Sequence, residues 1–96
     1  MQWIEVIGVR STGTHLEVLE SKLQSLLDEI EKGSQAHSVK VYRRVSIESD
    51  LCVHLFHDSK RAEINGSRLG LCLAAGLKAF GLVHHSIWTE IPGRHV

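Results

Sequence analysis

Apolar and polar residues alternate over residues 2–10, "QWIEVIGVR", as they do in a β-strand with two unlike faces. Over residues 3–9, one parity has no charged member and consists of Ile4, Val6 and Gly8. The other parity includes a carboxylate and consists of Trp3, Glu5, Ile7 and Val9. We therefore expect a strand here, with its uncharged parity facing the core.

Two segments repeat their apolar residues at spacings of three and four, which is typical of amphipathic helices. The first stripe consists of Leu16, Leu19, Leu23, Leu26, Leu27 and Ile30. The second consists of Leu69, Cys72, Leu73, Gly76, Leu77 and Phe80. A glycine follows each stripe and marks its end, Gly33 and Gly81 respectively. Thr14 and Glu17 have the spacing of a capping box, and Ser67 is placed to cap the second helix. The pattern predicts helices over 15–32 and 68–80.

Three further segments have the β-branched composition or the alternation of strands, namely 38–48, 51–57 and 82–91. A turn at 48–50 joins the first two of them into a hairpin. Asn65 and Gly66 form a strong turn signal in the loop before the second helix, and Pro92 ends the last strand.

The resulting order, β-α-β-β-α-β, predicts one α+β domain over residues 1–96 with a ferredoxin-like fold. Right-handed crossovers place the strands, numbered along the chain, in the order 4-1-3-2, with both helices on one face of an antiparallel sheet. His85 then lies under or beside the helices. The face opposite the helices is expected to carry Trp3, Glu5, Ile7, Val9, Tyr42, Arg44, Cys52, His54, Phe56, His84, Ser86, Trp88 and Glu90.

That opposite face is too apolar to remain in water on so small a monomer, since it includes Trp3, Ile7, Val9, Phe56, Leu82 and Trp88. Two such sheets packed face to face across a two-fold axis would bury these residues and enclose a cavity. We therefore expect a homodimer that forms through this face.

Candidate chemistry is concentrated on the same predicted face. His54, His84 and Glu5 share its parity and lie on neighbouring strands, so they form either a cluster with a general base or metal ligands, or separate polar residues at an interface rim. His54 and His84 are the candidate catalytic residues. His57, at the strand end, is interpreted as a solvated loop residue. The expected ligand-binding set is Glu5, Tyr42, Arg44, Phe56, Ser86 and Trp88.

Composition narrows the function classes. Hydrophobic residues at 43% and charged residues at 23% are typical of a globular domain, and no apolar run approaches the length of a spanning helix. Eleven basic and eleven acidic side chains cancel, which argues against a nucleic-acid partner. No CxxC or HxxxH spacing indicates a metal, and no motif indicates a cofactor. We expect a cytoplasmic protein without a disulfide, a metal or a cofactor.

The βαββαβ order and the mixed second sheet face, with a last strand of the kind "SIWTE", resemble the dimeric α/β-barrel superfamily. The resemblance implies relatives such as cofactor-independent monooxygenases, muconolactone-isomerase-like enzymes and stress-responsive barrel proteins. Three hypotheses remain open: a homodimer that binds a small apolar or aromatic molecule between its sheets, a cofactor-free monooxygenase or isomerase, and a purely structural interaction domain.

Overall fold

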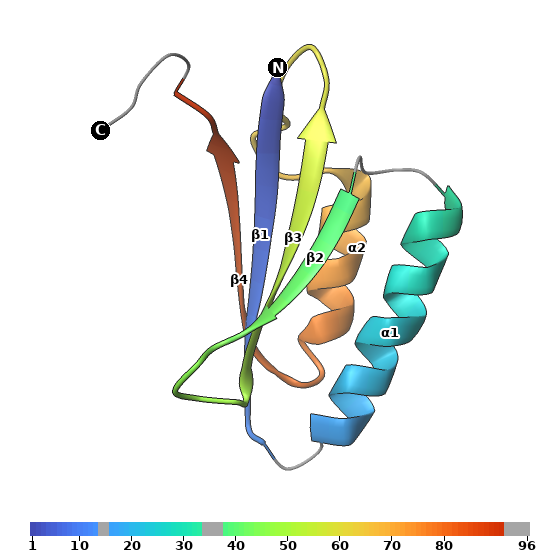
Figure 1. Cartoon of the computed structure of the whole chain (residues 1–96), viewed down its shortest axis with the longest axis vertical. Coiled ribbons are helices and arrows are strands. Elements are labelled where there is room, and N and C mark those ends of the chain that lie inside the picture. Colours follow the sequence, from blue (N-terminus) through green and yellow to red (C-terminus); the bar gives the residue numbers. More distant parts are fainter. Residues whose placement is uncertain (14–15, 34–37, 92–96) are drawn as a thin grey trace.

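The computed structural model describes residues 1–13, 16–33 and 38–91 (Figure 1). Its elements are β1 (Gln2–Ser11), α1 (Leu16–Gly33), β2 (Ser38–Arg43), β3 (Asp50–Asp58), α2 (Arg68–Leu77) and β4 (Gly81–Thr89). This order confirms the predicted βαββαβ succession. Thr14, the predicted cap of the first helix, and Pro92, the predicted end of the last strand, lie outside the described residues.

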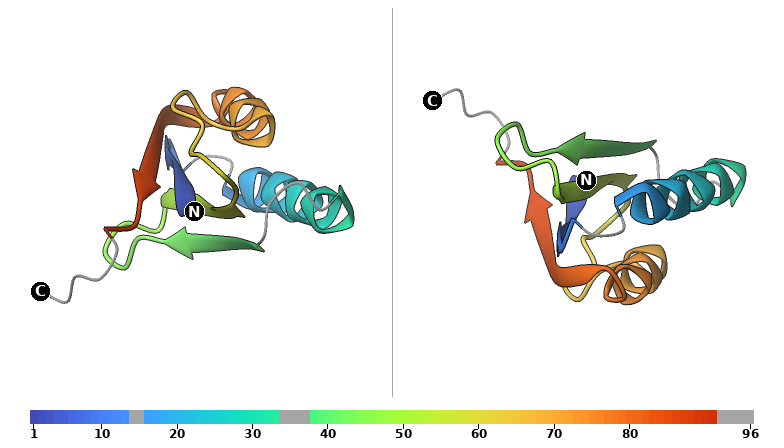
Figure 2. Two further views of the ribbon diagram at one scale, coloured as in Figure 1. Left: turned by 90° about the horizontal axis from the view of Figure 1, so that it is seen from above. Right: turned by 90° about the horizontal axis from the view of Figure 1, so that it is seen from below.

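The four strands form one antiparallel sheet in the order β2-β3-β1-β4, which is the predicted order read from the other edge. Both helices lie on one face of it (Figure 1). Figure 2 shows the sheet along its strands: β2 and β4 bend away from the helices, so the uncovered face is concave. The architecture is consistent with a ferredoxin-like fold.

Several element ends differ from the prediction. The second strand ends at Arg43 instead of 48, because the chain turns early and the Arg44 amide donates to the Asp50 carbonyl at 2.9 Å. Helix α2 ends at Leu77 with Lys78 as its C-cap, so Gly81 starts β4 and does not stop the helix. The Ser67 cap and the Gly66 turn are confirmed, the latter by a φ of +96°.

The face of β1 that packs against the helices was predicted wrongly. Trp3, Glu5, Ile7 and Val9 are buried, whereas Ile4, Val6 and Gly8 lie on the opposite face. The three large apolar side chains of the first set fill more of the core than an isoleucine, a valine and a glycine, and this outweighs the presence of Glu5. The core of the described chain comprises Ile7, Val9, Leu19, Leu23, Ile30, Leu51, Val53, Leu55, Leu73, Ala74 and Leu77.

The face without helices, here called the outer face, consists of three successive rows of paired residues across the sheet. The rows read from β2 to β4 as Ser38, Phe56, Ile4, Trp88; then Lys40, His54, Val6, Ser86; then Tyr42, Cys52, Gly8, His84. Leu82 follows below them on β4, opposite Arg10. This face is mixed, as predicted, but its β1 members are the smaller apolar residues.

Cys52 and Cys72 are both free, and Cys72 is exposed although the helical stripe assigned it to the core. Neither helix of the described chain is long and apolar enough to cross a membrane.

Candidate functional site

A carboxylate lies in the middle of the sheet face that the helices cover. Glu5 is 0% exposed and sits directly opposite Leu55 on β3 and Ile87 on β4. His57 comes two positions after Leu55 and lies opposite Trp3, whereas His85 comes two positions before Ile87 and lies opposite Ile7, so the two imidazoles reach Glu5 diagonally from opposite directions along β1. Sheet register therefore brings a carboxylate and two imidazoles together from three strands.

Each oxygen of this carboxylate has an imidazole partner. His57 Nε2 lies 2.7 Å from Glu5 Oε1, and His85 Nε2 lies 2.7 Å from Glu5 Oε2. The Ser67 hydroxyl also donates to Oε1, and it accepts from the Gly70 amide at 3.0 Å. We call Glu5, His57, Ser67 and His85 the Glu5 cluster. It joins β1, β3 and β4 to the start of α2.

Two glycines allow the loop and helix backbone to approach this cluster. A Cβ at Gly70 would lie 1.9 Å from Glu5 Oε2, and a Cβ at Gly66 would lie 2.4 Å from the His85 ring. Any larger residue at these positions would displace the carboxylate or the imidazole. Gly66 and Gly70 therefore complete the walls of the Glu5 cluster.

The hydrogen bonds specify what the cluster can do chemically. A buried carboxylate is costly unless it is hydrogen-bonded, and here three side chains supply donors. A carboxylate has no proton to donate, so each imidazole donates from Nε2 and keeps Nδ1 as its basic nitrogen. Such a carboxylate orients an imidazole and stabilises its charged form, as in acid–base catalysis.

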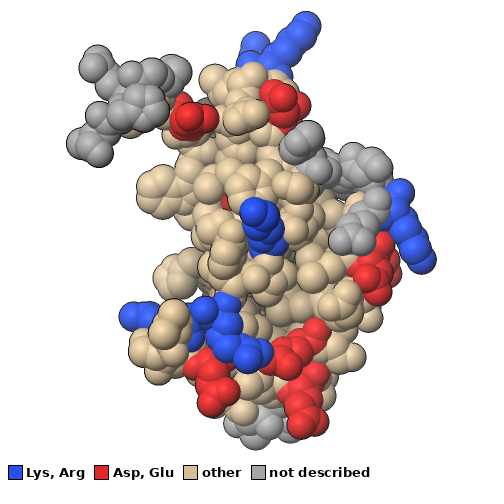
Figure 3. Space-filling view, in the orientation of Figure 1, with Lys and Arg blue, Asp and Glu red and all other residues tan. Residues whose placement is uncertain are grey.

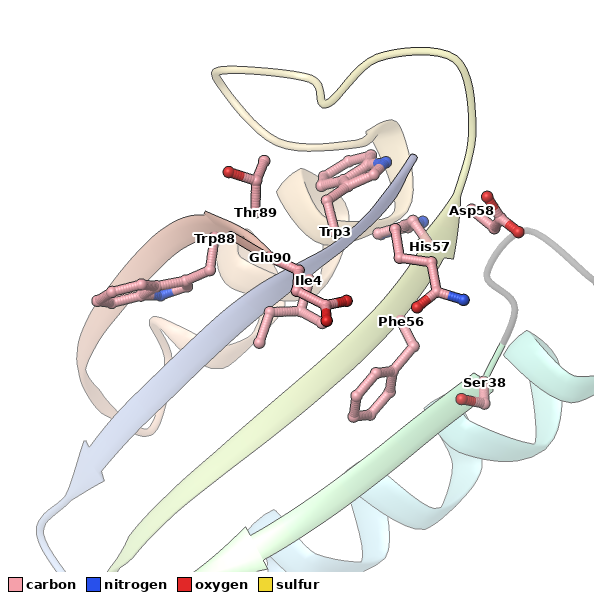
Figure 4. Close-up of a pocket in the computed structure, with 10 residues that line it drawn as sticks. Trp3, Ile4, Ser38, Phe56, His57, Asp58, Trp88, Thr89 and Glu90 are labelled. Carbon is pink, nitrogen blue, oxygen red and sulfur yellow. The ribbon is translucent and has the colours of Figure 1, made fainter. Parts of the chain in front are cut away.

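A pocket of about 350 Å³ lies at the end of the sheet where β1 begins and β3 and β4 end. Figure 4 shows side chains from all four strands around it, and the full lining is Gln2, Trp3, Ile4, Ser38, Phe56, His57, Asp58, Trp88, Thr89 and Glu90. His57 is the member of the Glu5 cluster that also lines this pocket. The Trp3 ring stacks on His57 with 4.1 Å between ring centroids and 20° between planes.

Of the two alternatives left open for Glu5, His54 and His84, the structure rules out the cluster. His54 pairs with Val6 and His84 with Gly8, so both lie on the outer face while Glu5 points to the helices. The two histidines are also two strands apart, roughly 10 Å across the sheet, because β1 lies between them. Glu5 is therefore not on the face where a ligand-binding role was predicted for it.

His54 has aromatic neighbours in place of a carboxylate. Its ring centroid lies 4.6 Å from that of Tyr42 and 6.2 Å from that of Phe56. Burial lowers the pKa of His54 below the ordinary value of an imidazole. His54 is thus biased toward its neutral form on the outer face.

The predicted ligand-binding residues are separated by the structure. Phe56 and Trp88 line the pocket, and the Trp88 indole donates to the Ser86 hydroxyl at 2.8 Å. Tyr42 lies two rows away on the outer face. Arg44 follows β2 and pairs with Asp50 at 3.3 Å, away from the pocket.

Sequence reasoning missed His57 and Ser67 as site residues. His57 is only 8% exposed, which contradicts its interpretation as a solvated loop residue, because β3 extends past it to Asp58. His85 lies on the helix-covered face as predicted. The alternation of residues in β1 could have indicated this site. If Trp3, Ile7 and Val9 face the core, Glu5 is buried with them, and a buried carboxylate requires hydrogen-bond donors from neighbouring strands.

Within residues 1–13, 16–33 and 38–91, no group of three or more His, Cys, Asp or Glu side chains is arranged to hold a metal ion. In the Glu5 cluster the two imidazoles bond to different oxygens of one carboxylate. Its geometry is that of a hydrogen-bonded network.

No match identifies the chain. No protein-family model matches it, and no curated protein and no solved structure is significantly similar to it. Its function must be argued from the pocket, the outer face and the Glu5 cluster.

Proposed function

We propose that this chain is a homodimeric binding protein that pairs through its outer face and holds a small apolar or aromatic molecule in the pocket at the end of the sheet. The observation that carries the proposal is the combination of an uncovered, concave sheet face with a pocket lined by Phe56, Ile4 and Trp88 on that same face.

Exposure of large apolar groups supports an interface at the outer face. Trp88 is 58% exposed and Leu82 is 67% exposed, and both project from β4 on this face. Figure 3 shows mostly uncharged surface over the strands, interrupted by the atoms of a few Lys and Arg side chains. Large apolar side chains exposed on one face of a small protein favour association through that face.

A second copy of the chain fits this face better than a small molecule alone. The face spans four strands, whereas the pocket occupies only one end of it. The concave curvature allows two sheets to close around a shared interior, and the chain carries no net charge that would oppose self-association. The resemblance to dimeric α/β barrels points to the same occupant.

The pocket has the composition of a site for a flat apolar ligand. Its volume of about 350 Å³ is at the lower end of the range for small-molecule sites. Phe56 and Trp88 offer aromatic surfaces, while Ser38, Gln2 and Glu90 supply polar groups at its border. Such a lining suits one or two aromatic rings with a polar substituent.

Native mass spectrometry and sedimentation equilibrium test the dimer. We expect the wild-type chain to be dimeric and Trp88→Glu to be monomeric, because the new charge would be buried at the interface. Leu71→Glu is the matched control: Leu71 is 50% exposed on α2, away from the outer face. A wild-type monomer, or a Trp88→Glu dimer of unchanged affinity, would refute the interface.

Titration with Prodan, a neutral naphthalene dye, tests the pocket. Phe56→Ala should weaken dye binding by about tenfold, since it removes one aromatic wall of the pocket. Val18→Ala serves as the control, because Val18 lines a separate pocket beside Ser11 and Gly81, at the opposite end of β1. Equal affinity of wild type and Phe56→Ala would show that the dye binds elsewhere and would contradict the proposed pocket.

A further inference from the structure

The pocket at the end of the sheet is bordered by two carboxylates. Phe56 and Trp88 lie in one row of the outer face, and Asp58, two residues after Phe56 on β3, belongs to the same face. Glu90 follows β4 directly and also lines the pocket. No described Lys or Arg belongs to this lining. The aromatic surfaces of the pocket are therefore accompanied by negative charge.

Glu90 is the carboxylate of this pair whose charge is not matched within the described chain. Asp58 Oδ1 lies 3.5 Å from the amino group of Met1, whereas the Glu90 side chain makes no ion pair or hydrogen bond with any described residue. Figure 4 shows the Glu90 side chain between those of Trp88 and Phe56. Glu90 is therefore placed to pair with a charge on a molecule that lies against these rings.

The aromatic rings on this face are suited to a cation. The Phe56 ring already has one beside it, because Lys40 Nζ lies 5.7 Å from the ring centroid, within the range of a cation–π interaction. Trp88 is held in place by the hydrogen bond from its indole to the Ser86 hydroxyl at 2.8 Å, and an indole is the strongest aromatic partner of a cation. Aromatic surfaces beside an unpaired carboxylate favour an organic ammonium ion over a neutral or anionic group.

We propose that the ligand of this pocket is a small aromatic ammonium compound, either an amine or a quaternary ammonium. The inference rests on the proposed function, because it requires the pocket to hold a ligand, and it specifies the charge of that ligand. The apolar body contacts Phe56 and Trp88, while the ammonium group pairs with Glu90. An anionic ligand would instead face both Asp58 and Glu90, and a neutral one would leave the charge of Glu90 unmatched.

Three naphthalene compounds that differ only in their end group test the charge preference. Naphthylmethyl-trimethylammonium is the cation, neopentylnaphthalene has the same shape without the charge, and naphthylacetate is the anion. The experiment measures the Kd of each compound for the whole chain by displacement of Prodan. Direct titration with Prodan, which is neutral, reports separately whether the pocket binds an aromatic molecule at all.

We expect the cation to bind about tenfold more tightly than its neutral isostere, and naphthylacetate to bind more weakly than either. Added sodium chloride should weaken binding of the cation and leave that of the neutral compound unchanged, because salt screens exposed charges.

Variants assign the preference to particular side chains. Glu90→Gln should weaken binding of the cation by about fivefold, because it removes the charge but little volume, and should leave the Prodan affinity unchanged. Glu17→Gln is the matched control, since it removes the same charge from the first turn of α1, at the other end of the molecule (Figure 1). Lys40→Met should strengthen binding of the cation, because it removes a positive charge beside Phe56.

The outcomes separate this inference from the proposed function. If Prodan binds but the three compounds bind equally well, or naphthylacetate binds best, the pocket stands and the ammonium ligand is refuted. A preference for the cation that is equally strong in Glu90→Gln, or weaker binding of the cation by Lys40→Met, would also refute it. If neither Prodan nor any of the three compounds binds, the pocket itself fails and the inference falls with it.

Discussion

At the residue scale, Glu5 is a fully buried carboxylate that links three strands and a helix through hydrogen bonds. Its two imidazole partners are only 8% and 17% exposed. A network of this kind specifies one arrangement of its partners, since the loss of any donor leaves a buried polar group unsatisfied. Gly66 and Gly70, which border it, should therefore tolerate substitution much less than Gly76, which lies further along α2.

Gly70→Ala and Gly76→Ala test this difference within α2. The Cβ that Gly70→Ala introduces would overlap Glu5 Oε2, so we expect a loss of about 1–3 kcal/mol in the free energy of unfolding. At Gly76 a Cβ meets no atom within 4 Å, and alanine should stabilise the helix by about 0.5–1 kcal/mol. Urea unfolding with a shared m-value measures both changes, and equal effects at the two positions would contradict the packing described for Glu5.

His54 provides a pH-dependent prediction on the outer face. Burial lowers its pKa in the folded chain, so the unfolded chain takes up the proton first as the pH falls. This contribution to stability is complete above the ordinary imidazole pKa and is lost as the pH drops through that value toward the folded one. NMR titration should place the His54 pKa below the ordinary value, and Tyr42→Ala should raise it by exposing the ring. A His54 pKa at or above the ordinary value would disprove the burial argument.

Predicting the site from the sequence required assigning the correct face of β1 to the core. Counting charges assigned Glu5 to the wrong face, whereas comparing apolar side-chain volumes would have assigned it to the core. Even with that correction, the contact of Glu5 with His57 and His85 requires the register of two strand pairs, which no local pattern contains. The Ser67 hydroxyl was recognisable as a cap, but its bond to Glu5 depends on the tertiary approach of α2.

At the element scale, the N-terminus of α2 is attached to the sheet through the residue that caps it. The Ser67 hydroxyl accepts from the Gly70 amide and donates to Glu5, so one side chain ends the helix and completes the buried network. Ordinary capping preferences should therefore fail at this position. Aspartate caps helices as well as serine does, but here its carboxylate would face that of Glu5.

A substitution series at Ser67 tests this double role. Ser67→Thr should remain close to wild type, and Ser67→Ala should lose about 1–2 kcal/mol of stability with its capping and carboxylate hydrogen bonds. Ser67→Asp should be less stable than Ser67→Ala at neutral pH, because two carboxylates would share the site, and should recover as acid protonates one of them. Thermal unfolding at several pH values measures this order. A Ser67→Asp variant as stable as wild type would show that Ser67 acts only as a cap.

The local hydrophobic pattern of the sequence predicted the helices and strands to a large extent. Apolar stripes located both helices, and alternation located all four strands, because these periods reflect burial of one side of each element. The errors lie at ends that tertiary contacts determine. The second strand stops at Arg43, since its partner β3 begins only at Asp50, and no residue of the sequence "RVSIES" marks that limit.

At the scale of the whole molecule, the bent sheet separates two environments. The convex side is sealed by α1 and α2 and contains the apolar core with the Glu5 cluster, while the concave side is uncovered by any described part of the chain (Figure 2). His57 and the pocket lie where the two sides meet, at the end of the sheet. Ile4, Phe56 and Trp88 line this pocket from the concave side, so the proposed pairing of two concave sides would enclose it.

Thermal unfolding at different protein concentrations tests this closed assembly. If folding and pairing are linked, the unfolding midpoint of wild type should rise by about 4 °C for each tenfold increase in concentration, because dimerisation stabilises only the folded chain. Trp88→Glu should abolish this dependence, whereas Leu71→Glu, on the exposed side of α2, should retain it. Acrylamide quenching reports the same event locally: Trp3 is 3% exposed in the single chain, so the loss of quenching on dimerisation should come from Trp88. A midpoint independent of concentration, together with a Trp88 that stays quenchable at high concentration, would show that the outer face remains open and that the pocket acts in a monomer.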